Sequence, residues 1–253
     1  REAVYGDLLP GERTRLHGRY AALLADVPGA AAELAYHSLT GHDVPGALAA
    51  SVRAGEEAER IGAPAEAHRF YDQALELWDR AADAEKLADM DRGKLALKSA
   101  VAAAASGDVP RAIQLLRHLR ATALAGDATP EFLTRVGERL AFNLMQSDEP
   151  GCAAEALRVI VETVEQAPPE PPSAARARAM ATSALAWLVS GDDTAAREWA
   201  ERARAEAARS GADWVIADIL VTLGMISGRE GNPAEAIGLF ADAHAQAVGT
   251  HMF

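Results

Sequence analysis

Small and apolar residues recur along this chain at helical spacing, in paired stretches separated by turn signals. In the clearest pair, Leu220, Leu223 and Gly224 fall on one helix face at i, i+3 and i+4. A second predicted helix follows after a turn, and its apolar face consists of Ala236, Phe240 and Ala243. A small residue at the crossing of two helices lets their axes approach closely, and the aromatic ring fills the space beside it.

A small residue followed twelve positions later by an alanine occurs five times. The pairs are Gly55 with Ala67, Ala100 with Ala112, Ala141 with Ala153, Ala184 with Ala196, and Gly224 with Ala236. Successive alanines are separated by 45, 41, 43 and 40 residues. A fixed offset inside a nearly fixed period is typical of a helical-repeat array, in which each unit is one hairpin. The pattern predicts an all-α fold of about five antiparallel hairpins.

Turn signals rich in glycine, aspartate and proline punctuate the predicted helices. Thr129-Pro130 places a capping residue before a proline at the first helical position, and Asp192 is a predicted N-cap. The stiffest break is the Pro-Pro-Glu-Pro-Pro run at 168–172, which is incompatible with a helix interior. It lies between the third and fourth pairs, so we expect a hinge or subdomain boundary there.

Composition narrows the class of partner. Apolar residues make up 49% of the 253 residues and aromatic residues only 5%, and no stretch shows strand alternation. The net charge of −12 disfavours direct binding of nucleic acid, because an acidic surface repels phosphate. No apolar run reaches the roughly 20 residues needed to cross a bilayer, so no membrane partner is expected. The one cysteine, Cys152, is expected to be buried and fits a reducing cytoplasm.

Two segments resemble a known repeat family. The run from Leu220 to Gly224, followed by Asn-Pro-Ala-Glu-Ala-Ile at 232–237 with Phe240 and Ala243, resembles a tetratricopeptide repeat (TPR). Residues 63–75 resemble the second helix of that motif. The resemblance implies a right-handed superhelix of antiparallel hairpins. The usual TPR period is about 34 residues, so the longer periods here are more similar to the wider arrays of MalT-type transcription activators.

The N-terminal residues resemble a different module. The Arg-Glu-Ala-Val-Tyr run at 1–5 and the later segments 33–37 and 41–43 are similar to the junction between the ATPase core and the repeats of large LuxR-type regulators. These regulators belong to the signal-transduction ATPases with numerous domains. The resemblance implies that residues 1–43 form a helical linker ending a winged-helix arm and that residues 44–253 form the repeat array. The alanine and arginine bias favours an actinobacterial source, and we expect the sequence to be an excerpt of a longer cytoplasmic protein.

The sequence offers little catalytic chemistry. It contains no Gly-x-x-x-x-Gly-Lys-Ser/Thr phosphate loop, so ATP hydrolysis by the parent protein would need a domain outside this segment. His37 and His42 are the best metal candidates, but their spacing does not place them on one helix face and no third ligand is evident. We therefore expect no catalytic residue, no cofactor and no metal.

A concave groove is the remaining candidate site. In TPR arrays, a first-helix position six residues before the small residue faces this side, and here it is basic in three successive repeats. The predicted groove residues are Lys94, Leu97, Arg135, Phe142, Met145, Arg178, Leu185, Leu188 and Met225. A basic row beside an apolar floor suits an acidic peptide, a protein segment or a small acidic effector. The alternative is that these residues are solvated helix surface and apolar positions covered by adjacent helices.

These observations lead to a non-catalytic sensor or protein-interaction module of a bacterial transcriptional regulator. Binding of a peptide, protein or small effector would then bias the other domains of the parent, which requires different affinities for its two states. Two alternatives stay open. The array is a self-association or autoinhibitory scaffold, or it is the regulatory repeat region of a nucleotide cyclase.

Overall fold

A computed structural model describes residues 8–249 of the chain. Within that range the chain forms thirteen α-helices and two short 3-10 helices, with no strand. The predicted all-α class is therefore confirmed. The chain divides into two compact units, Arg1–Leu115 and Leu116–Phe253, and the division falls within helix α8 (Val109–Ala125). No helix within 8–249 is long and apolar enough to cross a membrane.

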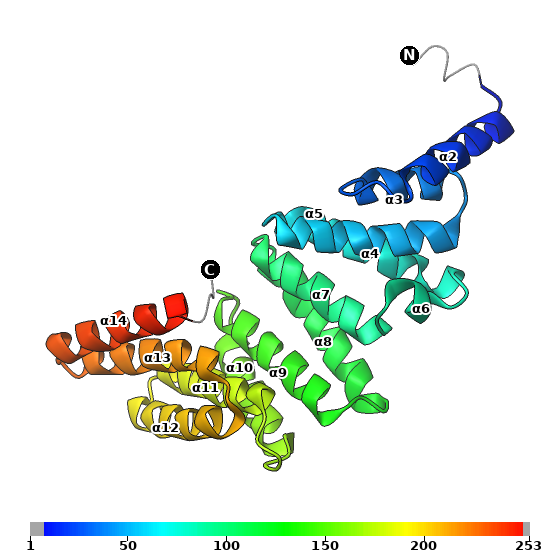
Figure 1. Cartoon of the computed structure of the whole chain (residues 1–253). Helices are drawn as coiled ribbons and strands as arrows, with labels where there is room; N and C mark the ends of the chain where they lie inside the picture. The colour runs from blue at the N-terminus through cyan, green and yellow to red at the C-terminus, as the bar shows by residue number, and fades with distance from the viewer. Residues whose placement is uncertain (1–7, 250–253) are drawn as a thin grey trace. The chain divides into compact units, whose positions relative to one another are not determined.

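The first unit is built from consecutive helices that pack on one another (Figure 1). α2 packs on α3, α3 on α4, α4 on α5, and α5 on α7. The bounds are α2 Pro10–Leu24, α3 Ala31–Thr40, α4 Val44–Arg60, α5 Pro64–Leu77, η1 Trp78–Arg80, α6 Ala84–Ala88 and α7 Arg92–Ala105. The short η1 and α6 segments lengthen the connection between α5 and α7, which accounts for the 45-residue spacing between the first two alanines.

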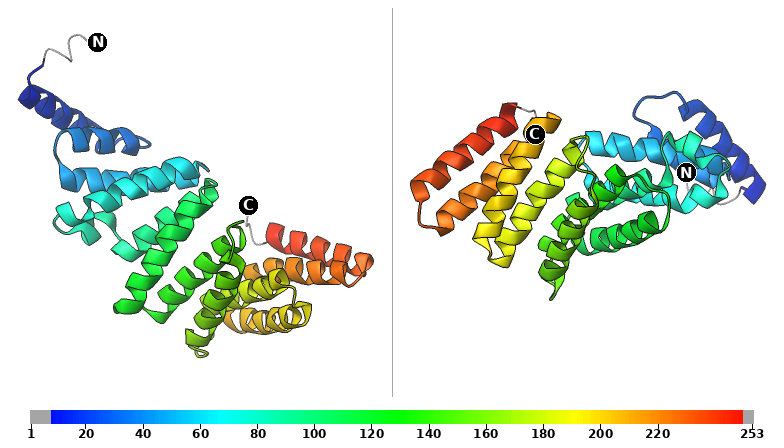
Figure 2. Two further views of the ribbon diagram at one scale, coloured as in Figure 1. Left: turned by 180° about the vertical axis from the view of Figure 1, so that it is seen from behind. Right: turned by 90° about the horizontal axis from the view of Figure 1, so that it is seen from below.

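The second unit contains three helical hairpins (Figure 2). α9 pairs with α10, α11 with α12, and α13 with α14, while the first helices α9, α11 and α13 also contact one another in order. The bounds are α9 Pro130–Met145, α10 Cys152–Gln166, α11 Ala174–Ser190, α12 Asp193–Ser210, η2 Asp213–Val215, α13 Ile216–Arg229 and α14 Pro233–Gly249. The alternation of first and second helices is the predicted hairpin pattern.

The helices begin where the capping chemistry predicts. The Thr129 hydroxyl accepts a hydrogen bond from the Phe132 N–H at 3.3 Å, with Pro130 at the first helical position. The Asp192 carboxylate accepts one from the Ala195 N–H at 2.9 Å, so its predicted role as an N-cap is confirmed. Each cap satisfies a helix-end N–H that has no partner inside the helix. Cys152 is buried, as predicted.

Glycine is required at two of the helix crossings. A Cβ added at Gly55 would lie 2.3 Å from Cε1 of Tyr71, and one added at Gly224 would lie 2.7 Å from Cε1 of Phe240. These distances are shorter than any ordinary van der Waals contact. The ring of the second helix therefore fills the space that the missing side chain leaves on the first, as predicted from the small-residue pattern.

The predicted frame of the third hairpin is wrong in its second helix. Ala153 is exposed, whereas Ala156 is fully buried together with Ile160. The reason is the turn between α9 and α10, which spans six residues, 146–151, where the turn between α4 and α5 spans three. The longer turn displaces the buried alanine by three positions, so the constant twelve-residue offset does not hold in this hairpin.

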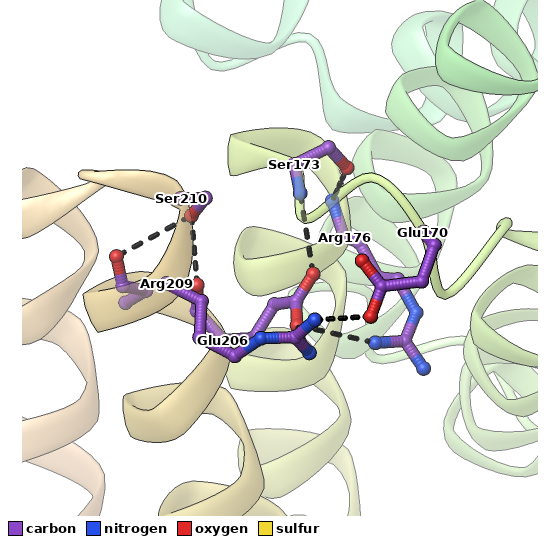
Figure 3. A network of polar contacts seen from close by, with 7 residues as sticks. Glu170, Ser173, Arg176, Glu206, Arg209 and Ser210 are labelled. Atoms are coloured by element: carbon purple, nitrogen blue, oxygen red, sulfur yellow. Dashed lines mark hydrogen bonds and ion pairs between the residues drawn. The ribbon is translucent and has the colours of Figure 1, made fainter.

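The proline-rich segment 168–172 lies inside the second unit and is attached to α12 by a polar network (Figure 3). Arg209 pairs with Glu170 of the segment and with Glu206 at 3.2 Å. The buried Glu206 carboxylate also accepts the Ser173 N–H at 3.2 Å and lies 3.4 Å from Arg176. Whether this segment is a hinge, and whether a boundary lies at residues 43–44, stay predictions. The motif at residues 1–5 lies outside the described residues.

Candidate functional site

A row of ionic side chains links the first helices of the second unit. Arg178 on α11 lies 3.2 Å from Glu138 on α9 through Nε and Oε1, and its other nitrogen pairs with Asp218 on α13. We call Glu138, Arg178 and Asp218 the ion row. The Glu138 side chain is only 4% exposed and that of Arg178 is 17% exposed. The three residues are spaced 40 apart in the sequence, so this contact fixes how neighbouring first helices lie against each other.

The ion row is supported by further polar contacts. The Thr182 hydroxyl donates to Oε1 of Glu138 at 2.9 Å, and Arg139 Nε lies 3.5 Å from Oε2 of the same carboxylate. The Arg178 guanidinium lies 5.7 Å from the ring centroid of Trp214. A buried carboxylate requires such partners, because an unpaired charge in this environment is strongly unfavourable. Arg178 thus has two carboxylate partners within its own unit.

The three predicted groove cations have different surroundings. Lys94 belongs to the first unit and its Nζ lies 3.2 Å from the carboxylate of Asp91, the N-cap of α7. Arg135 is exposed and makes no ion pair with any residue between 8 and 249. The α9 neighbour of Arg178 is Glu138, one helical turn beyond Arg135. The predicted row of cations is therefore not present in the second unit, where the charges along the first helices alternate in sign. Arg135 has no carboxylate partner among the described residues.

The predicted apolar floor divides into core and surface. Leu97 and Leu188 are buried and belong to the core, because adjacent helices cover them. Four predicted residues are half-buried, namely Phe142, Met145, Leu185 and Met225. Only half-buried or exposed side chains are able to contact a partner without unfolding the helices, so the candidate site is smaller than the predicted one.

Three of these residues form a second row beside the ion row. Met145, Leu185 and Met225 each lie seven residues after a member of the ion row, which is the same helix face two turns further along. We call them the apolar row, and we call the surface that carries both rows the α9–α11–α13 face. Methionine has an unbranched, adaptable side chain and is common at surfaces that bind varied partners. The face therefore combines an apolar row of adaptable side chains with an ion row whose side chains are held by ion pairs.

Two side-chain clusters in the first unit were not predicted from the sequence, although one of them contains the metal candidate His37. His17 and His37 approach each other with their Nδ1 atoms 2.8 Å apart, which joins α2 to α3. Burial, and then the neighbouring His37, lower the pKa of His17. The predicted candidate His42 is exposed, and no group of three or more potential metal ligands occurs within 8–249. The His17–His37 pair was not predicted, because the two residues lie 20 positions apart in the sequence.

The second cluster is a Ser–His–Asp set between α5 and α7. The Ser99 hydroxyl donates to Oδ1 of Asp72 at 2.7 Å and lies 2.9 Å from Nδ1 of His68. Asp72 contacts both partners, and Ser99 is fully buried. A catalytic serine is accessible and gives its proton to the histidine, whereas the Ser99 hydroxyl is buried and donates directly to Asp72. This cluster therefore ties two helices together and has no geometry for nucleophilic attack.

Comparisons with known proteins identify the architecture. No protein-family model and no curated protein matches the chain. Among solved structures, BtubC (BKLC) from P. vanneervenii has a TM-score of 0.60 at 16% identity, covering 98% of this chain and 94% of that one. A Podosopora anserina protein with nearly identical TPR-like repeats has a TM-score of 0.57 at 20% identity, covering 83% and 98%. The chain has a TPR-like fold.

A third structure agrees with this TPR-like assignment. TTC0263, a thermophilic TPR protein in Thermus thermophilus, has a TM-score of 0.50 at 21% identity and covers 77% of this chain and 92% of that one. At such identities the similarity concerns the fold.

Proposed function

We propose that this TPR-like chain is a non-catalytic protein-interaction module and that its α9–α11–α13 face binds a peptide or protein segment. The observation that carries the proposal is the pairing of the two rows on one face. The half-buried apolar row offers area that a partner would remove from water, and the ion row beside it holds three helices in register. A pre-formed face of this kind lowers the ordering cost of binding.

The chemistry of the partner follows from the charges. Arg178 already has two carboxylate partners, so it offers little to an acidic ligand. Arg135 is exposed and has no carboxylate partner within 8–249, one turn before Glu138 on α9. A suitable segment would cover Met145 and Met225 with apolar side chains and would place one acidic group near Arg135. The partner class is therefore an apolar peptide or protein segment with local acidic character, and a small acidic effector would use Arg135 alone.

The broader context rests on the resemblance of the N-terminal residues. We place the module in the cytoplasmic, regulatory part of a bacterial LuxR-type regulator, of actinobacterial type, where partner binding would change the balance between two states of the parent. The sequence runs that support this context are those at 1–5, 33–37 and 41–43. A helix-turn-helix output domain in the parent would support it, and a cyclase domain would favour the enzyme alternative.

The binding proposal has a direct test. Peptides selected from a random twelve-residue library on the whole chain would be labelled and titrated by fluorescence anisotropy. Replacing Met145 and Met225 together by serine removes partly buried apolar area worth about 1–2 kcal/mol, so affinity is expected to fall by about fivefold to thirtyfold. The matched control is Leu23→Ser, which removes an exposed apolar residue from α2. Equal affinity for the double variant and the wild type would refute the assignment of this face.

One observation favours a second candidate function, self-association. On α14, Ile237 is 68% exposed and Phe240 is 42% exposed, although Phe240 packs against Gly224 of its own hairpin. Exposed apolar residues on one helix are a common feature of interfaces between copies. Light scattering across a concentration series tests this: a rising mass that Ile237→Lys abolishes supports self-association, and a constant monomer mass excludes it.

A further inference from the structure

An open cavity of about 750 Å³ lies between α3 and α5 in the first unit. Its α3 wall contains Glu33, Tyr36 and Leu39, and its α5 wall contains Phe70 and Glu76. The volume lies within the range that holds a small ligand or a few side chains. It is distant in sequence from the α9–α11–α13 face, so an inference about it stands independently of the proposed function.

The aromatic wall of this cavity is held in position. Tyr36 is 58% exposed, yet its ring makes edge-to-face contacts with His17 at 5.6 Å and with His37 at 5.2 Å between centroids. Phe70 is buried and packs in a small core cluster with Ala31 and Ala54. The ring of Tyr36 is therefore ordered by its neighbours while much of its surface stays open. An ordered, exposed ring face attracts a cation.

The charges around the cavity are not balanced by the residues that line it. Glu33 and Glu76 make no ion pair with any residue between 8 and 249. The lining guanidinium, that of Arg69, lies 2.6 Å from Glu66 and 4.1 Å from the Phe70 ring centroid, so it is already engaged. Asp72, which also lines the cavity, accepts a hydrogen bond from Ser99 and lies 3.3 Å from Arg111 and 3.5 Å from the lining His68. The cavity lining therefore contains an exposed ring and two carboxylates that have no cationic partner among the described residues.

We propose that this cavity binds an arginine side chain from a basic segment of a partner protein. The guanidinium would lie against the ring of Tyr36 and between the carboxylates of Glu33 and Glu76, with its aliphatic stem along Leu39. Arginine fits better than lysine, because its planar fork both stacks on a ring and donates to two carboxylates. The net charge of −12 complements such a segment and raises its association rate.

The test uses the whole chain and a defined probe, a fluorescein-labelled, amidated peptide of alternating arginine and glycine. Binding is measured by anisotropy at about 0.15 M salt, where the attraction of distant charges is screened. Saturable binding is expected, and Glu33→Gln combined with Glu76→Gln should weaken it by about tenfold, the size of loss typical of removing charge-assisted contacts. Tyr36→Leu keeps the apolar bulk and removes most of the ring face, so it should weaken binding by about threefold to fivefold.

The matched control is Glu198→Gln combined with Glu201→Gln, which removes the same charge from the exposed surface of α12 in the second unit. This control should bind the probe as the wild type does, and a peptide with citrulline in place of arginine should bind to neither. An equal loss of affinity in the control variant would show diffuse charge attraction and overturn the proposal. So would the absence of saturable binding, or equal binding of the citrulline peptide. Far-UV circular dichroism verifies that all variants stay helical.

Discussion

Replacing Gly55 by alanine tests the helix crossing on which the repeat depends. Gly55 lies within α4, and the added Cβ would come 2.3 Å from Cε1 and 2.6 Å from Cδ1 of Tyr71. Ordinary van der Waals contact begins near 3.4 Å. Tyr71 is fully buried, so its ring has no free space into which it can move. The substitution therefore forces either the ring or the helix axis to shift.

Two opposing effects determine how much Gly55→Ala changes the free energy of unfolding. Overpacking a well-packed core destabilises a protein by about 1–3 kcal/mol. Alanine in place of glycine inside a helix stabilises it by about 1 kcal/mol. The clash exceeds the propensity gain, because the contact is too short by about a third of its normal length. The difference of the two effects is about 0–2 kcal/mol, and because the contact is so short we expect Gly55→Ala to lower the free energy of unfolding by the upper half of this range, about 1–2 kcal/mol.

Urea denaturation followed by circular dichroism measures this change. Gly18→Ala is the matched control, because Gly18 lies within α2 and an added Cβ there meets no atom within 4 Å. The control should raise the free energy of unfolding by about 0.5–1 kcal/mol, so the two substitutions should have opposite signs. In a Tyr71→Leu background the penalty of Gly55→Ala should largely disappear, as a coupled pair requires. Stabilisation by Gly55→Ala would refute the close crossing.

Two further predictions concern groups inside the helical packing. Because burial lowers the pKa of His17, the unfolded chain binds more protons than the folded one just below the ordinary value of 6.5. The contribution of His17 to stability should therefore be fully present above that value and be lost as the pH falls. His17→Gln should reduce the difference between the urea midpoints measured near pH 7.5 and pH 5. An unchanged difference would mean that other groups cause the pH dependence. Glu138→Gln removes a buried carboxylate that pairs with Arg178, so it should lower the free energy of unfolding by about 1–3 kcal/mol. The control Glu131→Gln, at the exposed start of α9, should change the free energy of unfolding by less than about 0.5 kcal/mol. Equal effects of the two glutamine variants would contradict a structural role for the ion row.

Much of the fold follows from local sequence. Helical periodicity, N-caps such as Thr129 and Asp192, and glycines opposite aromatic rings each depend on residues close together in the chain. These signals correctly predicted the hairpins α4–α5, α11–α12 and α13–α14 and the close crossings at Gly55 and Gly224. The buried alanine of the third hairpin was predicted wrongly because the fixed twelve-residue offset assumes a constant turn length. Its six-residue turn moved the buried position from Ala153 to Ala156.

The surroundings of the candidate site residues follow less from local sequence, because they depend on contacts between repeats. The sequence placed Met145, Leu185 and Met225 on first helices, and the structure shows them half-buried on α9, α11 and α13. It did not show that Arg178 pairs with Glu138 across α9 and α11, since that contact depends on how neighbouring first helices are offset. The His17–His37 pair was missed for the same reason. Residues brought together by packing leave no periodic signal in a single sequence.

The most direct test of the proposed interaction surface observes its methionines during binding. The chain contains five methionines, so methyl carbon-13 labelling gives a simple spectrum whose signals are assigned by substitution. Titration with the library-selected peptide should shift or broaden the methyl signals of Met145 and Met225, while that of Met90 in the first unit stays unchanged. A peptide that binds the chain but leaves both Met145 and Met225 unaffected would contradict the account.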